Sequence, residues 1–244
     1  MPHWESAPVV TTHSSVTYRK LFAEFLGSAL LALVVVGSGA AAQTLSPHDV
    51  GLELLENAAA TGAGLYVLIL VFAPLSGAHF NPVVSFADWA FGGATWQRAA
   101  AYLPTQVAGC VCGTLLADSI FSVSVNQLSQ QSRLTRAHFI SEIVATAGLV
   151  IVIFALTRTA NHAKVPAAVG CYIAGAYFFT SSTSFANPAI TIGRIFTSSF
   201  AGIAAGSVPG FIGAQVIGGI LGVLVVRTLY PTVHQPPSSE NEMA

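Results

Sequence analysis

The chain has 244 residues, of which 53% are hydrophobic and only 8% are charged, with nine Lys and Arg against ten Asp and Glu. Soluble domains carry about 25% charged residues, so this composition excludes an ordinary water-soluble enzyme, and its hydrophobicity excludes a disordered chain. A formal net charge of −1 provides no basic face for nucleic acid. The composition therefore indicates an integral membrane protein.

Six segments are long and apolar enough to span a bilayer, for which a helix needs about 20 residues. They are residues 19–42, 57–75, 97–119, 137–157, 164–180 and 207–229. The polar stretches 1–16 and 231–244 flank them, and we expect both to be disordered. The membrane domain is thus predicted to occupy residues 17–230.

Basic residues predict how this domain is oriented, since Lys and Arg concentrate in cytoplasmic loops. A cytoplasmic N-terminus places six of the nine basic residues inside and three outside. The inside set is Arg19, Lys20, Arg98, Arg158, Lys164 and Arg227, and the outside set is Arg133, Arg136 and Arg194. The sequence thus predicts a multi-pass protein of the cell membrane with both termini in the cytoplasm.

Two further segments, residues 76–90 and 181–206, are too short to cross the membrane and too apolar to be ordinary loops. Each contains an Asn-Pro pair, at Asn81-Pro82 and at Asn187-Pro188. A re-entrant segment that enters and leaves on the same side accounts for both properties.

The chain is an internal repeat, because three features recur in the same order at offsets of 118, 106 and 109 residues. These features are Glu24 and Glu142, Asn81 and Asn187, and Gln106 and Gln215. The halves, about 17–120 and 137–230, each hold three spans and must therefore point in opposite directions. Inverted repeats of this kind place the working site near the midplane, where the halves meet.

These features resemble the major intrinsic proteins, the family of aquaporins and aquaglyceroporins, over nearly the whole chain. The paired motifs Asn81-Pro82-Val83 and Asn187-Pro188-Ala189 carry the resemblance, together with the repeated Glu and Gln residues. It implies an all-α fold with six transmembrane helices and two re-entrant half-helices in an inverted 3+3 repeat. It also implies a passive channel that assembles as a homotetramer.

Both motifs are expected to start short helices, since Pro suits the first helical position and Asn the cap before it. Two such starts meeting at the midplane would present partial positive charge and amide donors to a solute, and would repel cations, as in aquaporin-type pores. The alternative is an ordinary helix cap at each site. Val83 replaces the family's usual Ala, which we expect to shift packing slightly without closing a pore.

Glu24 and Glu142 lie within apolar spans, where a carboxylate is commonly functional. A proton-coupled secondary transporter would use such groups, and this is the alternative to a channel. The resemblance suggests instead that each carboxylate accepts hydrogen bonds from a re-entrant loop. His79 is likewise expected to brace a loop or line the pore near the cytoplasmic entrance.

The resemblance also places a selectivity filter at four positions, here assigned to Ala63, Gly175, Ser184 and Ile190. The family usually has Arg at the last of these. Small and apolar residues imply a wide constriction that passes glycerol, urea or undissociated metalloid acids such as arsenite, along with water. Without the filter Arg, proton exclusion would depend on the two helix starts alone, so a proton leak is predicted.

Arg194 lies one helical turn beyond Ile190, so both side chains can share a face. It would then partly replace the missing filter charge from the outer vestibule. The alternative, slightly favoured by the sequence, is a surface Arg that extends to the lipid headgroups. No His, Cys, Asp or Glu residues have the spacing of metal ligands or of a catalytic dyad. We therefore expect no metal, no cofactor and no enzymatic activity.

Overall fold

The computed structural model describes residues 16–125 and 127–231, which form an all-helical domain without strands in those ranges. The predictions for the terminal stretches lie outside the described residues, apart from positions 16 and 231. The helices are α1 (Tyr18–Leu45), α2 (Val50–Ser76), α3 (Pro82–Ala90), α4 (Trp96–Ile120), α5 (Arg136–Arg158), α6 (Val165–Phe179), α7 (Pro188–Gly193) and α8 (Val208–Leu229). Short 3₁₀ turns precede α6 and α8 and follow α7.

The six predicted spans are confirmed as α1, α2, α4, α5, α6 and α8. Five of these helices, between 23 and 28 residues long when the 3₁₀ turn before α8 is included, are apolar enough to cross a membrane. The remaining one, α6, has only 15 residues and directly follows a 3₁₀ turn. The two re-entrant segments form the short helices α3 and α7.

Polar side-chain caps set the start of four long helices, α1, α2, α4 and α5. The side chain of Asp49 accepts a hydrogen bond from the backbone N–H of Leu52 at 2.9 Å, and that of Thr135 accepts one from His138 at 3.1 Å. Such caps satisfy backbone donors that have no partner within the helix. The helix starts therefore follow from local sequence, at the ends of the apolar runs.

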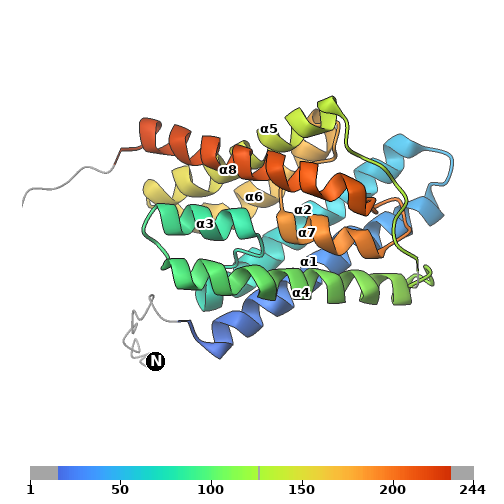
Figure 1. The fold of residues 1–244 in the computed structure, drawn as a ribbon, viewed down its shortest axis with the longest axis horizontal. Coiled ribbons are helices and arrows are strands. Elements are labelled where there is room, and N and C mark those ends of the chain that lie inside the picture. The colour runs from blue at the N-terminus through green and yellow to red at the C-terminus, as the bar shows by residue number, and fades with distance from the viewer. Residues whose placement is uncertain (1–15, 126, 232–244) are drawn as a thin grey trace, which may run out of the picture.

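The long helices run roughly along the long axis of the molecule, side by side in one bundle (Figure 1). In the first half α1 packs against α2 and α4, and in the second half α5 packs against α6 and α8. The halves meet where α2 contacts α6, and again where α3 and α7 fill the space between α4 and α8. Figure 1 shows α3 and α7 end to end in the middle of the molecule.

Glycines allow the closest helix pairs to touch backbone to backbone. A methyl group added at Gly113 of α4 would overlap the carbonyl oxygen of Ala29 on α1. The repeat places Gly222 of α8 in the same way against Ala147 of α5, where the added carbon would lie 2.8 Å from the carbonyl oxygen. Small residues at such crossings are how helices associate in lipid.

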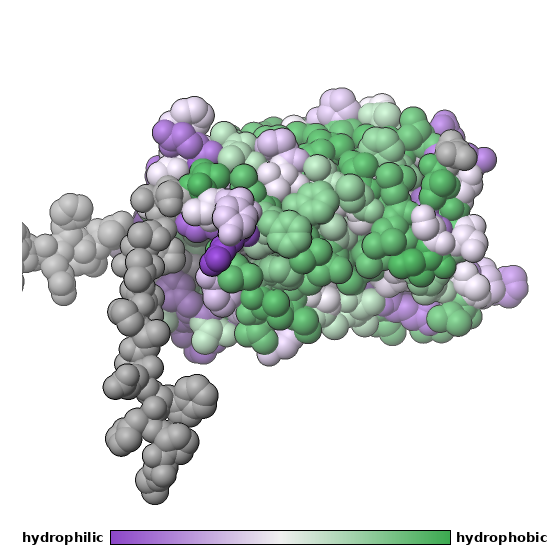
Figure 2. Space-filling model, turned by 90° about the horizontal axis from the view of Figure 1, so that it is seen from below, coloured by the Kyte–Doolittle hydropathy of each residue, from purple (hydrophilic) through white to green (hydrophobic). Residues whose placement is uncertain are grey.

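The outer surface has a broad apolar band with polar residues at both ends (Figure 2). Large hydrophobic side chains of the spans are exposed, including Leu70 and Phe178 at 54% each. A face of this kind requires lipid contact, because soluble proteins rarely expose large apolar patches. The described chain begins and ends at the same end of the molecule (Figure 1).

Candidate functional site: a central cavity between two half-helices

The two Asn-Pro motifs start the half-helices as expected from their chemistry. The side-chain oxygen of Asn81 accepts a hydrogen bond from the N–H of Val83 at 3.0 Å. That of Asn187 accepts one from Ala189 at 2.9 Å and one from Ile190 at 3.3 Å. Each asparagine is thus the cap of a helix whose first residue is proline.

The tips of α3 and α7 are bonded to one another across the repeat. The amide nitrogen of Asn81 donates to the carbonyl oxygen of Ala186 at 2.7 Å, and that of Asn187 donates to Phe80 at 2.8 Å. Each amide carries two N–H groups, so this bond leaves a second donor on each side chain. Both asparagines line the same cavity, into which those donors can point.

The loop before α3 is held by Glu24, which is fully buried. Its carboxylate accepts hydrogen bonds from the hydroxyl of Ser76 at 2.6 Å and from the backbone N–H groups of His79 at 2.9 Å and Phe80 at 2.8 Å. The amide of Gln106 donates a fourth bond at 2.7 Å. The carboxylate therefore replaces the partners that an irregular loop lacks within a membrane.

Glu142 holds the loop before α7 in the same way. It accepts from the hydroxyl of Ser182 at 2.6 Å, from the N–H groups of Phe185 at 2.9 Å and Ala186 at 2.8 Å, and from the amide of Gln215 at 2.7 Å. Within the described residues neither carboxylate lines the central cavity. This geometry supports loop bracing rather than proton coupling, since the hydrogen bonds of each carboxylate go to its loop and to a glutamine.

These loops need such bracing because their backbones are strained. Ala78 and Phe80 in the first loop, and Ser184 and Ala186 in the second, have φ angles between 47° and 51°. Non-glycine residues rarely adopt the left-handed region, and each such residue costs on the order of 1–3 kcal/mol. The conformation turns successive backbone N–H groups toward the carboxylate.

The central cavity, with a volume of about 70 Å³, runs past both motifs. Long helices supply an apolar wall that includes Leu31 and Leu149, while the two loops and the asparagines supply the polar groups. A passage of this composition gives a solute hydrogen-bond partners beside apolar surface. It fits small uncharged molecules, since a bare cation would meet two helix starts without a compensating anion.

A second cavity of about 420 Å³ adjoins the first at His79, which lines both. The Nδ1 atom of His79 lies 3.0 Å from the hydroxyl of Ser85, and its Nε2 atom lies 3.4 Å from Asp88. Asp88 also accepts a hydrogen bond from Arg98 at 3.0 Å. His79 thus lies between the wide vestibule, at the end where the described chain begins and ends, and the narrow cavity.

Two of the four filter residues assigned from sequence line the central cavity and two do not. Ser184 and Ile190 line it, whereas Ala63 and Gly175 are exposed on the outside of α2 and α6. Gly175 has only the edge of a phenylalanine ring within 4 Å of where a side chain would start. The assignment of these two positions is therefore corrected.

On the same two helices, Thr61 and Tyr177 face the cavity. Their hydroxyl oxygens lie 3.1 Å apart. One signal for Thr61 was present in the sequence, because a polar residue inside a transmembrane helix usually faces the protein interior. The wall of the central cavity is consequently more polar than the sequence predicted.

Arg194 does not extend to the lipid headgroups, and that interpretation is wrong. It begins the 3₁₀ turn after α7, is only 3% exposed and lines the central cavity. Its guanidinium carbon lies 3.5 Å from the ring centre of Phe185, and its Nε donates to the carbonyl oxygen of Ala201. A charged side chain is therefore present near the position where Ile190 replaces arginine.

Comparison with known proteins agrees with this arrangement. A sequence model described as major intrinsic protein matches residues 11–186. The chain belongs to the major intrinsic protein family. Members of this family are membrane channels rather than enzymes, and the resemblance stated from the sequence is confirmed.

Two relatives of known name are similar to this major intrinsic protein. The aquaglyceroporin AqpS of Rhizobium meliloti (strain 1021) is 46% identical over 211 residues, which cover 86% of this chain and 90% of the relative. The glycerol uptake facilitator protein of Pseudomonas aeruginosa is 31% identical over 167 residues, which cover 59% of each protein.

A solved structure has the same fold. The X-ray structure of the aquaglyceroporin from Plasmodium falciparum aligns with a TM-score of 0.63 and 21% sequence identity, covering 88% of this chain and 96% of that one. The predicted fold class of the major intrinsic proteins is thereby confirmed for this chain.

Proposed function

We propose that the protein is a passive channel for small uncharged solutes, namely glycerol, urea or undissociated metalloid acids such as arsenite, along with water. The observation that carries this proposal is the pair of asparagine amides at two meeting helix starts beside a narrow cavity. The names of the two relatives, an aquaglyceroporin and a glycerol uptake facilitator, support glycerol as one solute.

Thr61, Tyr177, Ser184 and Ile190 form the constriction in this proposal, each being a lining residue of the central cavity. Three hydroxyl groups and one apolar side chain suit a solute that has both hydroxyl groups and a carbon or metalloid core. The role of His79 is to separate the vestibule from this passage. Val83 has no role in the passage, because it faces an outer groove instead.

Stopped-flow light scattering of proteoliposomes tests the function. Glycerol, urea and arsenous acid should enter faster than into bare lipid vesicles, in proportion to their gradients and with no dependence on a proton gradient. Uptake no faster than through bare lipid for every solute would end the proposal. Saturable uptake against a gradient, driven by pH, would select a transporter instead.

We further propose that the protein resides in the plasma membrane with both termini in the cytoplasm and assembles as a homotetramer. The distribution of basic residues supports the orientation. The tetramer is what the family resemblance implies. The mass of the detergent-solubilised protein, measured by light scattering with the detergent subtracted, should equal four chains.

A further inference from the structure

Arg194 has the burial and the surroundings of a functional side chain. In the part of the chain that the structure describes, only its Nε atom has a protein acceptor, the carbonyl oxygen of Ala201. The two terminal nitrogens belong to a residue that lines the central cavity and have no acceptor among the described residues. A buried guanidinium left with free donors at a cavity needs partners from whatever passes through it.

Phe185 fixes the position of this guanidinium. Its ring lies 3.5 Å from the guanidinium carbon of Arg194, and the N–H of Phe185 is bonded to Glu142. The ring is therefore anchored to the same carboxylate that braces the loop before α7. A stacked and hydrogen-bonded guanidinium loses less freedom when a solute binds than a free side chain would.

Arg133 provides a natural comparison, because it packs against the same ring without lining the cavity. Its guanidinium carbon lies 5.6 Å from the ring centre of Phe185, and its nitrogens donate to the carbonyl oxygens of Gly202 at 2.7 Å and Phe200 at 2.6 Å. Burial lowers the pKa of Arg133 to about 10 by desolvation, so it stays charged at neutral pH. Its bonds satisfy backbone groups of the loop, which is a structural role.

Ser184 completes a polar strip beside Arg194. Its hydroxyl is buried, belongs to a cavity-lining residue and has no hydrogen-bond partner among the described residues. The hydroxyl pair of Thr61 and Tyr177 lines the same cavity. Ile190 is an apolar residue on its wall. The central cavity thus combines the guanidinium of Arg194 and several hydroxyl groups with an apolar surface.

We propose that Arg194 is the selectivity cation of this channel, moved one helical turn outward from the place that Ile190 occupies. It donates hydrogen bonds to the oxygens of neutral polyhydroxylated solutes and repels small cations. The role in binding solutes rests on the proposed channel function, whereas the role in repelling cations does not. The proton leak predicted from the sequence assumed that no such cation was present, so we now expect little leak.

The test compares Arg194→Gln with Arg133→Gln in proteoliposomes. A pH-sensitive dye reports proton and methylammonium entry, and light scattering reports glycerol and water entry. Arg194→Gln should raise cation entry at least about tenfold, because the substitution removes a positive charge that lines the cavity and repels an entering cation. It should also change the ratio of glycerol to water flux. Arg133→Gln should leave cation entry at the wild-type rate.

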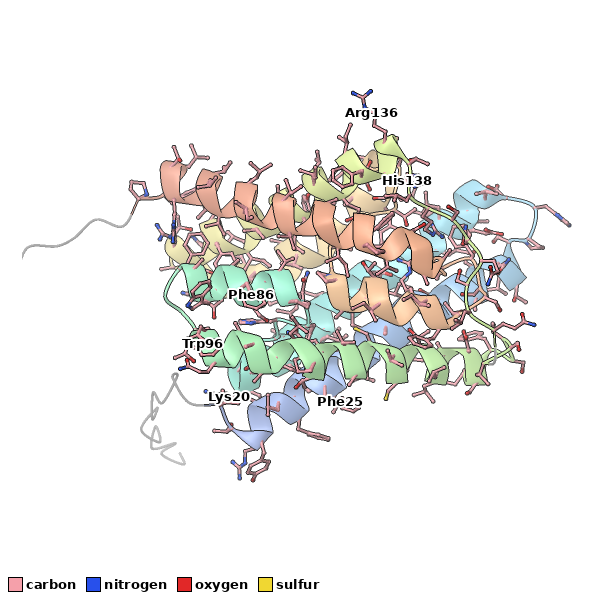
Figure 3. All side chains as sticks on the ribbon, viewed as in Figure 1. Lys20, Phe25, Phe86, Trp96, Arg136 and His138 are labelled. Atoms are coloured by element: carbon pink, nitrogen blue, oxygen red, sulfur yellow. The ribbon has the colours of Figure 1, made fainter. Side chains whose placement is uncertain are left out.

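Two further variants separate selectivity from folding. Arg194→Lys keeps the charge and should keep cations out, and adding Ile190→Arg to Arg194→Gln should restore exclusion. The exposed Arg136, which points away from the molecule in Figure 3, gives the surface control Arg136→Gln. Wild-type cation entry and solute ratio in Arg194→Gln would overturn the inference, as would a leak that Ile190→Arg does not reverse.

The two proposals fail in different ways. If wild-type vesicles take up no solute faster than lipid, the channel function fails, while the cation measurement on Arg194→Gln still reports on the barrier. If wild-type vesicles conduct glycerol and Arg194→Gln behaves identically, only the role of Arg194 fails.

Discussion

Two buried carboxylates show how single residues make an irregular backbone possible inside a membrane. Glu24 and Glu142 are each 0% exposed and accept four hydrogen bonds. Moving a charge out of water costs several kcal/mol, and each hydrogen bond to a charged group returns about 1.5–3 kcal/mol. Four donors per carboxylate are sufficient to offset that cost, so the charge needs no proton-transfer role to explain it.

Thr61 and Ala63 offer a matched pair for locating the constriction. Thr61→Phe places a ring in a cavity of about 70 Å³, whereas Ala63→Phe places it on the exposed outer face of α2. We expect glycerol flux to fall at least about tenfold in the first variant, which corresponds to about 1.4 kcal/mol of added barrier. Flux through the second should match wild type, as measured by stopped-flow light scattering.

Vesicles carrying equal amounts of protein, with equal elution volumes in detergent, provide the control for expression and assembly. A lower glycerol flux through Ala63→Phe than through Thr61→Phe would show that Ala63 lies at the constriction. Equal flux through both would mean that Thr61 is not at the narrow point.

The difference between these two residues explains which parts of the site could be predicted from sequence. Motif residues such as Asn81 and Asn187 could be found because proline, capping and repetition identify them locally. Residues on a helix wall could not, since each position turns the helix by about 100°, and a two-residue error faces the opposite side. Ala63 and Gly175 were each two residues from Thr61 and Tyr177, which face the cavity.

At the scale of elements, the half-helix α3 fits its neighbours through a complementary pair of residues. Val83 points away from the central cavity and lines an outer groove of about 480 Å³. A methyl group added at Gly219 of α8 would overlap its Cγ1 atom. The extra bulk of valine in this motif is thus accommodated by glycine on the facing helix, which agrees with the expectation that Val83 does not close the pore.

This pair predicts a coupled effect on stability. Gly219→Ala should lower the free energy of unfolding by about 1–3 kcal/mol, the usual cost of overpacking. Val83→Ala removes the overlapping atoms, so the double variant should recover most of that loss. Thermal unfolding in detergent should be measured for the wild type, for each single variant and for the double variant. Additive effects of the two substitutions would show that Val83 and Gly219 are not in contact.

The long helices and the half-helices differed in how well the sequence predicted them. Six spans followed from hydrophobic length, because a helix in lipid satisfies its backbone internally. The end of α7 at Gly193 did not follow, since the change from α-helix to a 3₁₀ turn depends on packing against α4. A regular helix would also have placed Arg194 on the face of Ile190, so the surface interpretation came from the general tendency of Arg to reach headgroups and not from helix geometry.

At the scale of the whole molecule, the basic residues are distributed unequally between its two ends. Lys20 and Trp96 lie at the end where the described chain starts and finishes, and Arg136 and His138 lie away from that end (Figure 3). The order of the six spans assigns six of the nine basic residues to the end where the described chain starts and finishes. The positive-inside rule therefore assigns this end, with its vestibule at His79, to the cytoplasm.

Reporter fusions test this assignment. A green fluorescent protein fused after Ala244 should fluoresce, because it folds in the cytoplasm, and an alkaline phosphatase inserted after the exposed Ser124 should be active, because it matures only outside. The reverse pair, phosphatase after Ala244 and fluorescent protein after Ser124, should both be silent. Six helices of alternating direction return the chain to the side where it began, so both reporters must change together. A fluorescent insertion after Ser124 would invert the channel and place Arg194, with its cation barrier, at the cytoplasmic mouth.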